Sequence, residues 1–201
     1  MRTNASLRLV VVSCSYDPLI DSTPHRHHTS GVPERSHVAR RIEDVDWKQW
    51  APVDPATLVF VIRDGQILLI RKKRGLGAGK INGPGGRIET GEQPAAGAVR
   101  ELQEELGVRA GPLTRMGDHR FQFVDGYSIY VHVYRASEVH GTPIETDEAT
   151  PFWCDVDAIP FDEMWEDDRY WLPLLLRGKR FSGYWIFEGD TMLDYRLEVL
   201  D

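Results

Sequence analysis

Three acidic side chains, Glu101, Glu104 and Glu105, lie within five residues of one another. At about 100° per residue, a helix would project these carboxylates to one side, where they can converge on one point. Oxygen ligands in this number suit a hard divalent cation, Mg²⁺ or alternatively Mn²⁺, which keeps waters and shares its coordination with substrate phosphates. The stretch therefore indicates a metal site for phosphate chemistry, and the competing interpretation is a solvated acidic helix face.

The placement of charge favours the metal site over the solvated face. Glu101 and Glu105 are like charges one turn apart, a pairing that slightly destabilises a helix, and acids near its carboxyl end oppose the helix dipole. A bound divalent cation would reverse both penalties. Arg100 directly precedes the first acid, and we expect it to hold a neighbouring carboxylate in place rather than to touch a substrate.

A helix from about Pro94 to Leu106, ended by Gly107, is predicted to present these acids. One stripe of its surface is apolar and is expected to face the core: Ala95, Ala98, Val99, Leu102 and Leu106. The chemistry would then lie beside a buried helix face.

Three hairpins are predicted around this helix, because paired β-rich runs flank short Asp-Gly or Glu-Gly-Asp segments. The strands are expected at 58–62 and 67–70, at 120–124 and 129–134, and at 184–187 and 193–199. A second helix is expected from about Phe161 to Arg177, ended by Gly178 and bent or split at Pro173.

Length and composition place the chain among soluble globular proteins. Its 201 residues are 41% hydrophobic and 27% charged, which fits one domain or one domain with an extension. A net charge of −7 argues against holding long nucleic acids by charge. No apolar run approaches the roughly 20 residues that span a bilayer. We expect a monomer with no membrane contact.

Two cysteines, Cys14 and Cys154, are too few for a disulfide framework, and no cysteine and histidine cluster has zinc spacing. These features predict a cytoplasmic protein. The short apolar stretch at 9–12 is a poor secretory signal, whereas organellar import or nuclear presence stays open.

Charge and composition change near residue 54. Residues 1–53 contain 7 basic and 6 acidic side chains, whereas residues 54–201 contain 17 and 25. We therefore predict an amino-terminal extension, 1–53, that is partly flexible, and a catalytic domain, 54–201. His25, His27 and His28 could bind a metal, but a solvated tail is the simpler interpretation.

A longer motif contains all three glutamates. The segment from Gly86 to Val108 fits the pattern G-x5-E-x7-R-E-U-x-E-E-x-G-U, with U apolar, at every specified position. A chance match at one start point is expected on the order of once in 10⁹. The chain thus resembles the Nudix hydrolases.

The resemblance implies an α+β fold in which a mixed β-sheet is sandwiched between helices. A loop-helix-loop motif would bind a divalent metal and a diphosphate-containing nucleotide. By motif position, it implies that Glu101, Glu104 and Glu105 are metal ligands, one of them helping to deprotonate water. Glu92 and Gly86 would be architectural, and the match alone leaves the substrate open.

A narrower resemblance extends from Thr57 to about Val199. There the chain is similar to the oxidised-purine nucleoside triphosphatases of the MutT-homologue type, through short motifs at 72–75, 77–79, 82–83, 85–86, 100–105, 141–143, 159–161, 164–165, 167–168 and 170–171. Such enzymes hydrolyse 2-hydroxy-dATP, 8-oxo-dGTP and related damaged triphosphates to monophosphate and pyrophosphate, which cleanses the nucleotide pool. Alternatives are another nucleoside diphosphate derivative as substrate, or a nucleotide sensor without turnover. An RNA-end processing enzyme is disfavoured by the acidic balance.

The same resemblance assigns residues to the phosphate end of the substrate and to the metal site. Lys72 lies in a basic run, 71–74, before a segment with six glycines between Gly75 and Gly86, so a flexible backbone can approach phosphates beside cations. Glu148 matches a further acid that approaches the metal in similar enzymes.

The base end of the substrate is assigned to an amide, two aromatics and an acid pair: Asn82, Phe121, Trp165, Asp167 and Asp168. The amide offers a donor and an acceptor to a purine edge. If burial raises the pKa of one aspartate, the protonated acid can donate while its neighbour accepts, so one pocket would take different purine edges. Each aromatic could instead fill the core.

Three departures from the family pattern concern the base pocket. Ile81 stands where the family often has Trp, Leu76 where it often has Phe, and Pro84 where another aromatic is common. We expect a wider pocket, or a different ranking of substrates.

Overall fold

The computed structural model describes residues 11–12 and 38–200. The predictions on Cys14 and on the three histidines at 25–28 fall outside these residues. Cys154 has a free thiol. Within the described residues, no helix is both long and apolar enough to cross a membrane.

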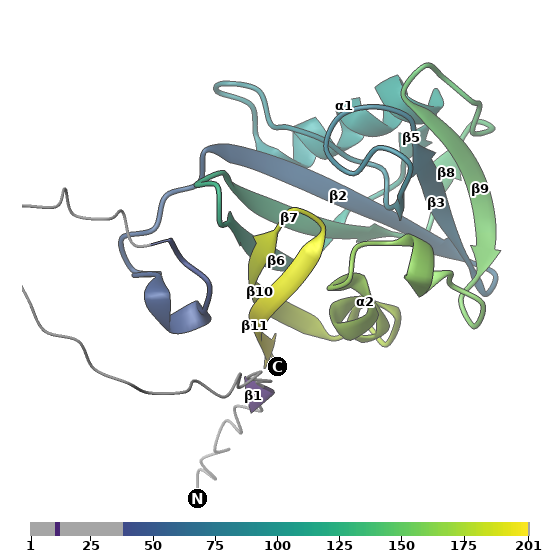
Figure 1. Cartoon of the computed structure of the whole chain (residues 1–201). Helices are drawn as coiled ribbons and strands as arrows, with labels where there is room; N and C mark the ends of the chain where they lie inside the picture. The colour runs from purple at the N-terminus through teal and green to yellow at the C-terminus, as the bar shows by residue number, and fades with distance from the viewer. Residues whose placement is uncertain (1–10, 13–37, 201) are drawn as a thin grey trace, which may run out of the picture.

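A mixed sheet forms the centre of the molecule (Figure 1). Its main strands are β2 (Asp54–Arg63), β6 (Thr114–Phe123), β7 (Ser128–Ala136), β10 (Arg180–Glu188) and β11 (Thr191–Leu200). They stand in the order β11-β10-β6-β7-β2. The pairs β2–β7 and β6–β10 are parallel, whereas β6–β7 and β10–β11 are antiparallel hairpins. The three predicted hairpins are confirmed, with longer strands than expected.

The first hairpin opens into a fork. β2 and β3 (Gln66–Lys72) pair only next to their turn, at Ile62–Ile67 and Arg63–Gln66. Beyond that point β2 stays with β7, whereas β3 pairs with β4 (Ile81–Asn82) and β9 (Ala149–Asp155). The two strands therefore diverge from the turn (Figure 1).

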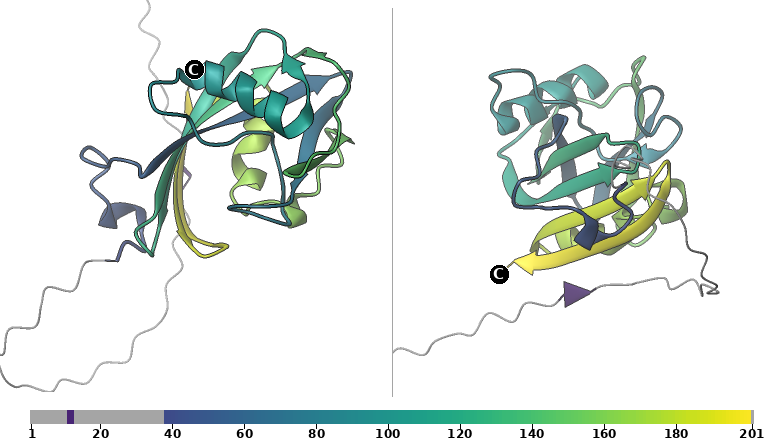
Figure 2. Two further views of the ribbon diagram at one scale, coloured as in Figure 1. Left: turned by 90° about the horizontal axis from the view of Figure 1, so that it is seen from above. Right: turned by 60° about the vertical axis from the view of Figure 1, so that its left-hand side comes forward.

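Two helices cover opposite faces of these strands. α1 (Pro94–Leu106) packs on β2, β7 and β9, and α2 (Asp168–Leu176) packs on β10 and β11 (Figure 2). Along β2, Phe60 points into the hydrophobic cluster on the α2 side, and its neighbours Val59 and Val61 point into the cluster on the α1 side. This alternation buries both faces of the strand, as the predicted sandwich requires.

The first predicted helix has the expected bounds but a different buried face. α1 runs from Pro94 to Leu106, and Gly107 ends it in a left-handed conformation with φ 69°. Ala98, Leu102 and Leu106 are buried as expected, whereas Ala95 is exposed and Val99 is half-buried. Glu101 and Glu105 are buried instead. The helix is thus rotated so that two of its acids face the protein.

The second predicted helix is interrupted, but not at Pro173. A 3-10 turn, η2 (Phe161–Glu163), is followed by an irregular stretch, and α2 begins only at Asp168. Pro173 lies inside α2. The interruption places Trp165, Asp167 and Asp168 at the amino-terminal end of α2. Two short strands, β5 (Arg109–Ala110) and β8 (Val139–His140), pair at the other side of the molecule.

Residues 38–53 pack on the outer side of the large sheet (Figure 2). They contain a 3-10 turn, η1 (Ile42–Asp44), that contacts β10 and β11. The ring of Trp47 meets that of Tyr184 edge-on at 5.0 Å between centroids. Farther upstream, β1 (Val11–Val12) pairs with β11.

Candidate active site

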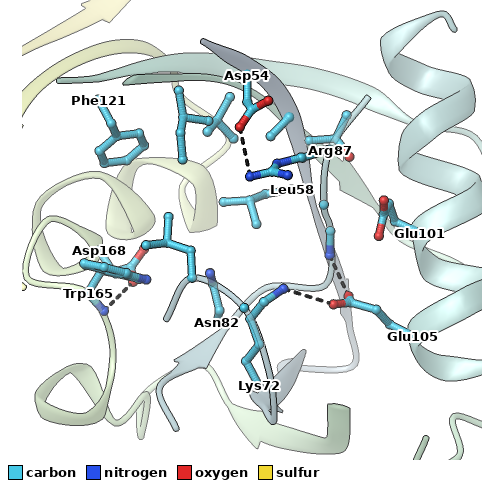
Figure 3. Close-up of a pocket in the computed structure, with 18 of the residues that line it drawn as sticks. Asp54, Leu58, Lys72, Asn82, Arg87, Glu101, Glu105, Phe121, Trp165 and Asp168 are labelled. Carbon is cyan, nitrogen blue, oxygen red and sulfur yellow. Dashed lines mark hydrogen bonds and ion pairs between the residues drawn. The ribbon is translucent and has the colours of Figure 1, made fainter. Parts of the chain in front are cut away.

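A pocket of about 540 Å³ lies in the fork between β2 and β3. Figure 3 shows Glu101 and Glu105 on α1 at one side of it, and Phe121, Trp165 and Asp168 at the other. Lys72 on β3 and Asn82 on β4 lie between the two sides. These residues come from five separate segments and line one cavity, with glutamates at one end and aromatic rings at the other.

The acidic end is built against two glycines. Glu101 and Glu105 have 9% and 1% of their surface exposed. The backbone N–H of Gly85 donates to Glu105 Oε2 at 2.8 Å. The carboxylate of Glu101 fills the place that a side chain at Gly86 would take. Gly86, which begins the motif, therefore lets the Glu101 carboxylate lie against the loop backbone.

Burial changes the acidity of both carboxyls. Desolvation raises the pKa of Glu105 to about 7, against the opposing effects of Lys72 and of the Gly85 amide. Desolvation also raises the pKa of Glu101, although Arg100 beside it acts in the opposite direction. Lys72 Nζ lies 3.4 Å from Glu105 Oε1. Glu105 is thus paired with Lys72 and Glu101 with Arg100, while burial disfavours the charged form of both acids.

Arg100 connects the glutamates of the motif. Its guanidinium donates to Glu92 at 2.9 and 3.0 Å, to Glu101 at 2.9 Å and to Glu104 at 2.8 Å. A fifth bond, at 2.9 Å, reaches the backbone oxygen of Arg87. These carboxylates raise the pKa of Arg100, so it keeps its charge. The orienting role expected for Arg100 agrees with this geometry.

The predicted metal ligands do not all line the pocket. Glu101, Glu105 and Glu148 line it, whereas Glu104 has a half-exposed side chain paired with Arg100. Glu148 is paired with Arg74. Among residues 38–200, no three acidic, histidine or cysteine side chains are grouped closely enough to hold a metal as they stand.

The donors at this end nevertheless fit a hard divalent cation. They are carboxylate oxygens, which Mg²⁺ and Mn²⁺ prefer. The desolvation that raises the pKa of Glu101 and Glu105 disfavours their charged forms, and a cation would offset that cost. Glu101, Glu105 and Glu148 offer such oxygens to the pocket but would have to draw closer together to share one cation, and Glu104 would have to leave Arg100 to join them.

The opposite end contains the aspartate pair. Asp167 and Asp168 are each only 2% exposed. The indole of Trp171 donates to Asp167 Oδ2 at 2.9 Å, and the backbone N–H of Trp165 donates to Asp168 Oδ2 at 3.1 Å. Desolvation raises the pKa of Asp167 to about 7 and that of Asp168 well above its usual value. Burial of the two carboxyls therefore favours partial protonation of the pair.

Aromatic rings form the walls next to this pair. Phe121, as predicted, and Phe123 lie on the same face of β6, and both line the pocket. Trp165 lines it as well, with Lys80 Nζ 5.0 Å from its ring centroid and the Gly77 backbone against its indole nitrogen. These rings offer flat apolar surfaces that suit a purine.

Two predicted polar groups lie between the ends. Lys72 and Asn82 both line the pocket. Asn82 Oδ1 accepts the N–H of Gly83 at 2.8 Å, which leaves its amide N–H groups for a ligand. The other side chains of the basic run, 71–74, point to different places. Arg74 lines the pocket, whereas Arg71 pairs with Glu163 and Lys73 pairs with Glu145 on the outside.

The three departures from the family pattern lie in different places. Leu76 lines the pocket and is exposed, whereas Ile81 is 2% exposed within the core. Pro84 is buried. The wider pocket expected from these positions stays a prediction.

Among the pocket residues that the sequence analysis missed, four have polar side chains that the following contacts involve. Arg87 lies 3.0 Å from the carboxylate of Asp54, and Tyr127 donates to the same carboxylate at 2.6 Å (Figure 3 shows the first pair). Thr57 is buried, and its hydroxyl has no partner among the described residues. Arg87 lies inside the motif at an unspecified position. Asp54 and Tyr127 are 73 residues apart, so no local pattern relates them.

Comparison with known proteins agrees with this arrangement. Residues 52–175 match the NUDIX domain family. The chain is 45% identical over 147 residues to the oxidized purine nucleoside triphosphate hydrolase of Danio rerio, and 46% identical to that of Mus musculus. Each match covers 72% of this chain and 94% of the relative.

Solved structures show the same fold. A mutator MutT protein from Bacillus halodurans superimposes with a TM-score of 0.65 at 24% identity, over 72% of this chain and 97% of that one. A MutT NUDIX hydrolase from Burkholderia pseudomallei gives 0.51 at 30% identity, over 55% and 88%.

Proposed function

This chain belongs to the Nudix family, and on that premise we propose that it is a hydrolase of oxidised purine nucleoside triphosphates. The products would be the nucleoside monophosphate and pyrophosphate. The relatives in Danio rerio and Mus musculus, which are named for this activity, match over most of their length. Hydrolysis of 2-hydroxy-dATP and 8-oxo-dGTP would remove damaged precursors from the nucleotide pool.

One observation supports this function most directly: a single pocket joins buried glutamates to a buried acid pair. A nucleoside triphosphate also has two chemically different ends, a polyphosphate and a base. Its polyphosphate requires cations and its base requires a flat apolar slot with polar groups at the edge. A cavity of about 540 Å³ falls within the usual range for small-molecule sites.

We propose that Glu101, Glu104, Glu105 and Glu148 hold Mg²⁺, with Mn²⁺ as a substitute. The bound cation would neutralise charge on the phosphates and on the departing pyrophosphate. Arg100 would orient Glu101 and Glu104 through its fork of hydrogen bonds. Lys72 would direct its ammonium to the phosphates, and one of the glutamates would accept a proton from the attacking water.

The base would bind at the opposite end. Trp165 and Phe121 would flank it, and the free amide N–H groups of Asn82 would donate to its edge. Asp167 and Asp168 share a site that favours partial protonation. A proton that moves between the two carboxyls would let the pair donate at one position and accept at the other, so both oxidised adenine and oxidised guanine would fit.

We further propose that residues 54–201 form the hydrolase domain and that residues 1–53 are an extension to it. We expect the protein to act as a cytoplasmic monomer. Size-exclusion chromatography with light scattering checks the oligomeric state, and imaging of the tagged full chain checks the location.

The test of this function is a kinetic comparison with Mg²⁺ of 2-hydroxy-dATP, 8-oxo-dGTP, 8-oxo-dATP, an alkylated purine triphosphate and undamaged dGTP. Products are identified by chromatography. We expect the oxidised purines to have the highest kcat/KM, and pyrophosphate rather than orthophosphate to appear. Turnover only of a dinucleoside polyphosphate or nucleotide sugar would replace the substrate assignment. Binding without any product would indicate a sensor.

A further inference from the structure

The β6–β7 hairpin forms one wall of the pocket. Phe121 and Phe123 on β6, and Ile129 on β7, direct their side chains into the cavity. Tyr127 lies in the turn between the strands and also lines it. The position of this hairpin therefore sets the distance between the aromatic wall and the rest of the pocket.

Gln122 holds the hairpin from the other side. It lies between the two phenylalanines on β6, so its side chain points to the opposite face of the sheet. Its amide nitrogen donates to the backbone oxygens of Phe123 and Tyr127, at 3.0 and 3.3 Å. One side chain thus spans the two strands next to their turn.

The amide of Gln122 is in turn held by Trp50. The indole N–H of Trp50 donates to Gln122 Oε1 at 2.9 Å, in a partly buried contact. Three residues later, the N–H of Val53 donates to the backbone oxygen and to the hydroxyl of Ser128, each at 3.1 Å. Residues 50–53 therefore contact both strands of the hairpin on its outer face.

The segment that contains Trp50 has its own anchors on the sheet. The guanidinium of Arg40 makes two bonds of 2.8 Å to the carboxylate of Glu188, and the N–H of Ile42 donates to Asp194 at 2.8 Å. Trp47 packs against Tyr184, and its indole N–H donates to the Ile42 oxygen at 2.8 Å inside the segment. The segment is thus fixed to β10 and β11 independently of the hairpin.

Trp50 precedes the part of the chain that matches the NUDIX family, residues 52–175. We propose that Trp50 is a positioning residue for substrate binding: through Gln122 it fixes the β6–β7 hairpin, so residues 38–53 complete the base-binding wall from outside the sheet. The inference rests on the proposed function for the identity of the substrate.

The test is Trp50→Phe in the full-length chain, with Trp47→Phe as the matched control. Both substitutions remove an indole N–H from the same segment, but only the first breaks the bond to Gln122. We expect Trp50→Phe to raise KM for 8-oxo-dGTP about 3- to 10-fold, the usual effect of one hydrogen bond, with kcat within about twofold. Trp47→Phe should leave both constants near wild type.

Hydrogen exchange of peptides covering 121–129 gives a readout that does not depend on turnover. It should speed up in Trp50→Phe and not in Trp47→Phe. A second variant, Gln122→Glu, keeps an acceptor for Trp50 but loses both donors to the hairpin. It should raise KM in the same way, so the proposal stays testable if Trp50→Phe folds poorly.

Equal KM values and equal exchange in the two tryptophan variants would overturn the inference. If the wild-type protein hydrolyses none of the oxidised triphosphates, the proposed function fails instead. The exchange comparison would then still decide whether Trp50 fixes the hairpin.

Discussion

Glu105 has the most unusual environment of the predicted metal ligands. It is 1% exposed, it accepts the N–H of Gly85, and its nearest cation is Lys72 at 3.4 Å. A carboxylate gains little folding stability from such a place, because its desolvation is costly. The site is better explained by a bound cation than by stability alone.

We expect Glu105→Gln to lower kcat about 10²- to 10⁴-fold, since it removes a charged ligand from the cation site. The unfolding midpoint should not fall, because a buried charge is removed as well. Steady-state kinetics and thermal unfolding check the two effects. Gln103→Ala, an exposed change on the same helix, is the control and should keep wild-type turnover. Near-normal kcat in Glu105→Gln would refute its role as a ligand.

The aspartate pair predicts a pH dependence of stability. The pKa of Asp167 is raised to about 7 by burial, from about 3.8. Between these values the folded protein holds more protons than the unfolded chain. The stabilisation is therefore full below about pH 3.8 and is lost as pH rises through about 7.

Asp167→Asn keeps an acceptor for the Trp171 indole but cannot ionise. We expect the unfolding free energy of the wild type to fall between pH 6 and 9 by on the order of 1 kcal/mol or more relative to that of the variant. Urea unfolding at both pH values measures the difference. Parallel pH profiles for the two proteins would show that Asp167 does not titrate in this range.

At the scale of elements, α1 shows what the sequence could and could not predict. Its bounds followed from Pro94 and Gly107, which are local signals. Its buried face could not be predicted from local signals, because the burial of Glu101 and Glu105 depends on the approach of the glycine loop at 85–86. Hydrophobicity alone pointed to Ala95, which is exposed.

Two glycine substitutions separate the roles of two loops. We expect Gly86→Ala to lower kcat by at least about tenfold, because its methyl group would overlap the Glu101 carboxylate. Gly65→Ala meets nothing within 4 Å but has a φ of +75°. It should cost about 1 kcal/mol of stability and leave kcat unchanged. Kinetics and urea unfolding of both variants check this; unchanged kcat in Gly86→Ala would contradict the contact.

Contacts between elements that are far apart in the chain could not be predicted from the sequence. The stretch before α2 was wrongly predicted as helix although its contact is local: the backbone N–H of Trp165 donates to the carboxylate of Asp168. The group formed by Asp54, Arg87 and Tyr127 joins three separate segments, and the tryptophans at 47 and 50 meet the sheet through long-range contacts. The family resemblance nevertheless selected residues that line the pocket: Lys72, Asn82, Phe121 and the aspartate pair.

At the scale of the whole molecule, the core does not depend on the cation site. One hydrophobic cluster lies on the α2 side of β2 and β3 and the other on the α1 side, and both consist of well-packed apolar side chains. Arg100, Lys72 and Arg74 already neutralise the glutamates in part. The fold should therefore persist without metal.

We expect chelation with EDTA to abolish turnover while the far-UV circular dichroism spectrum stays unchanged. Mg²⁺ together with a non-hydrolysable oxidised nucleotide should raise the unfolding midpoint, by mass action. Readdition of Mg²⁺ should restore activity, which serves as the control for irreversible damage. Full activity after exhaustive chelation would exclude the cation as a participant, and unfolding on chelation would make it structural.

The division of the core has a consequence for how such a protein can change over generations. Trp165 and Phe121 pack on the cluster beside α2, whereas the apolar residues of α1 belong to the other cluster. Mutations that reshape the proposed slot for the base would thus change the packing of one hydrophobic cluster. The helix that bears the acids packs in the other cluster. Substrate preference can drift while the hydrolytic apparatus is inherited intact.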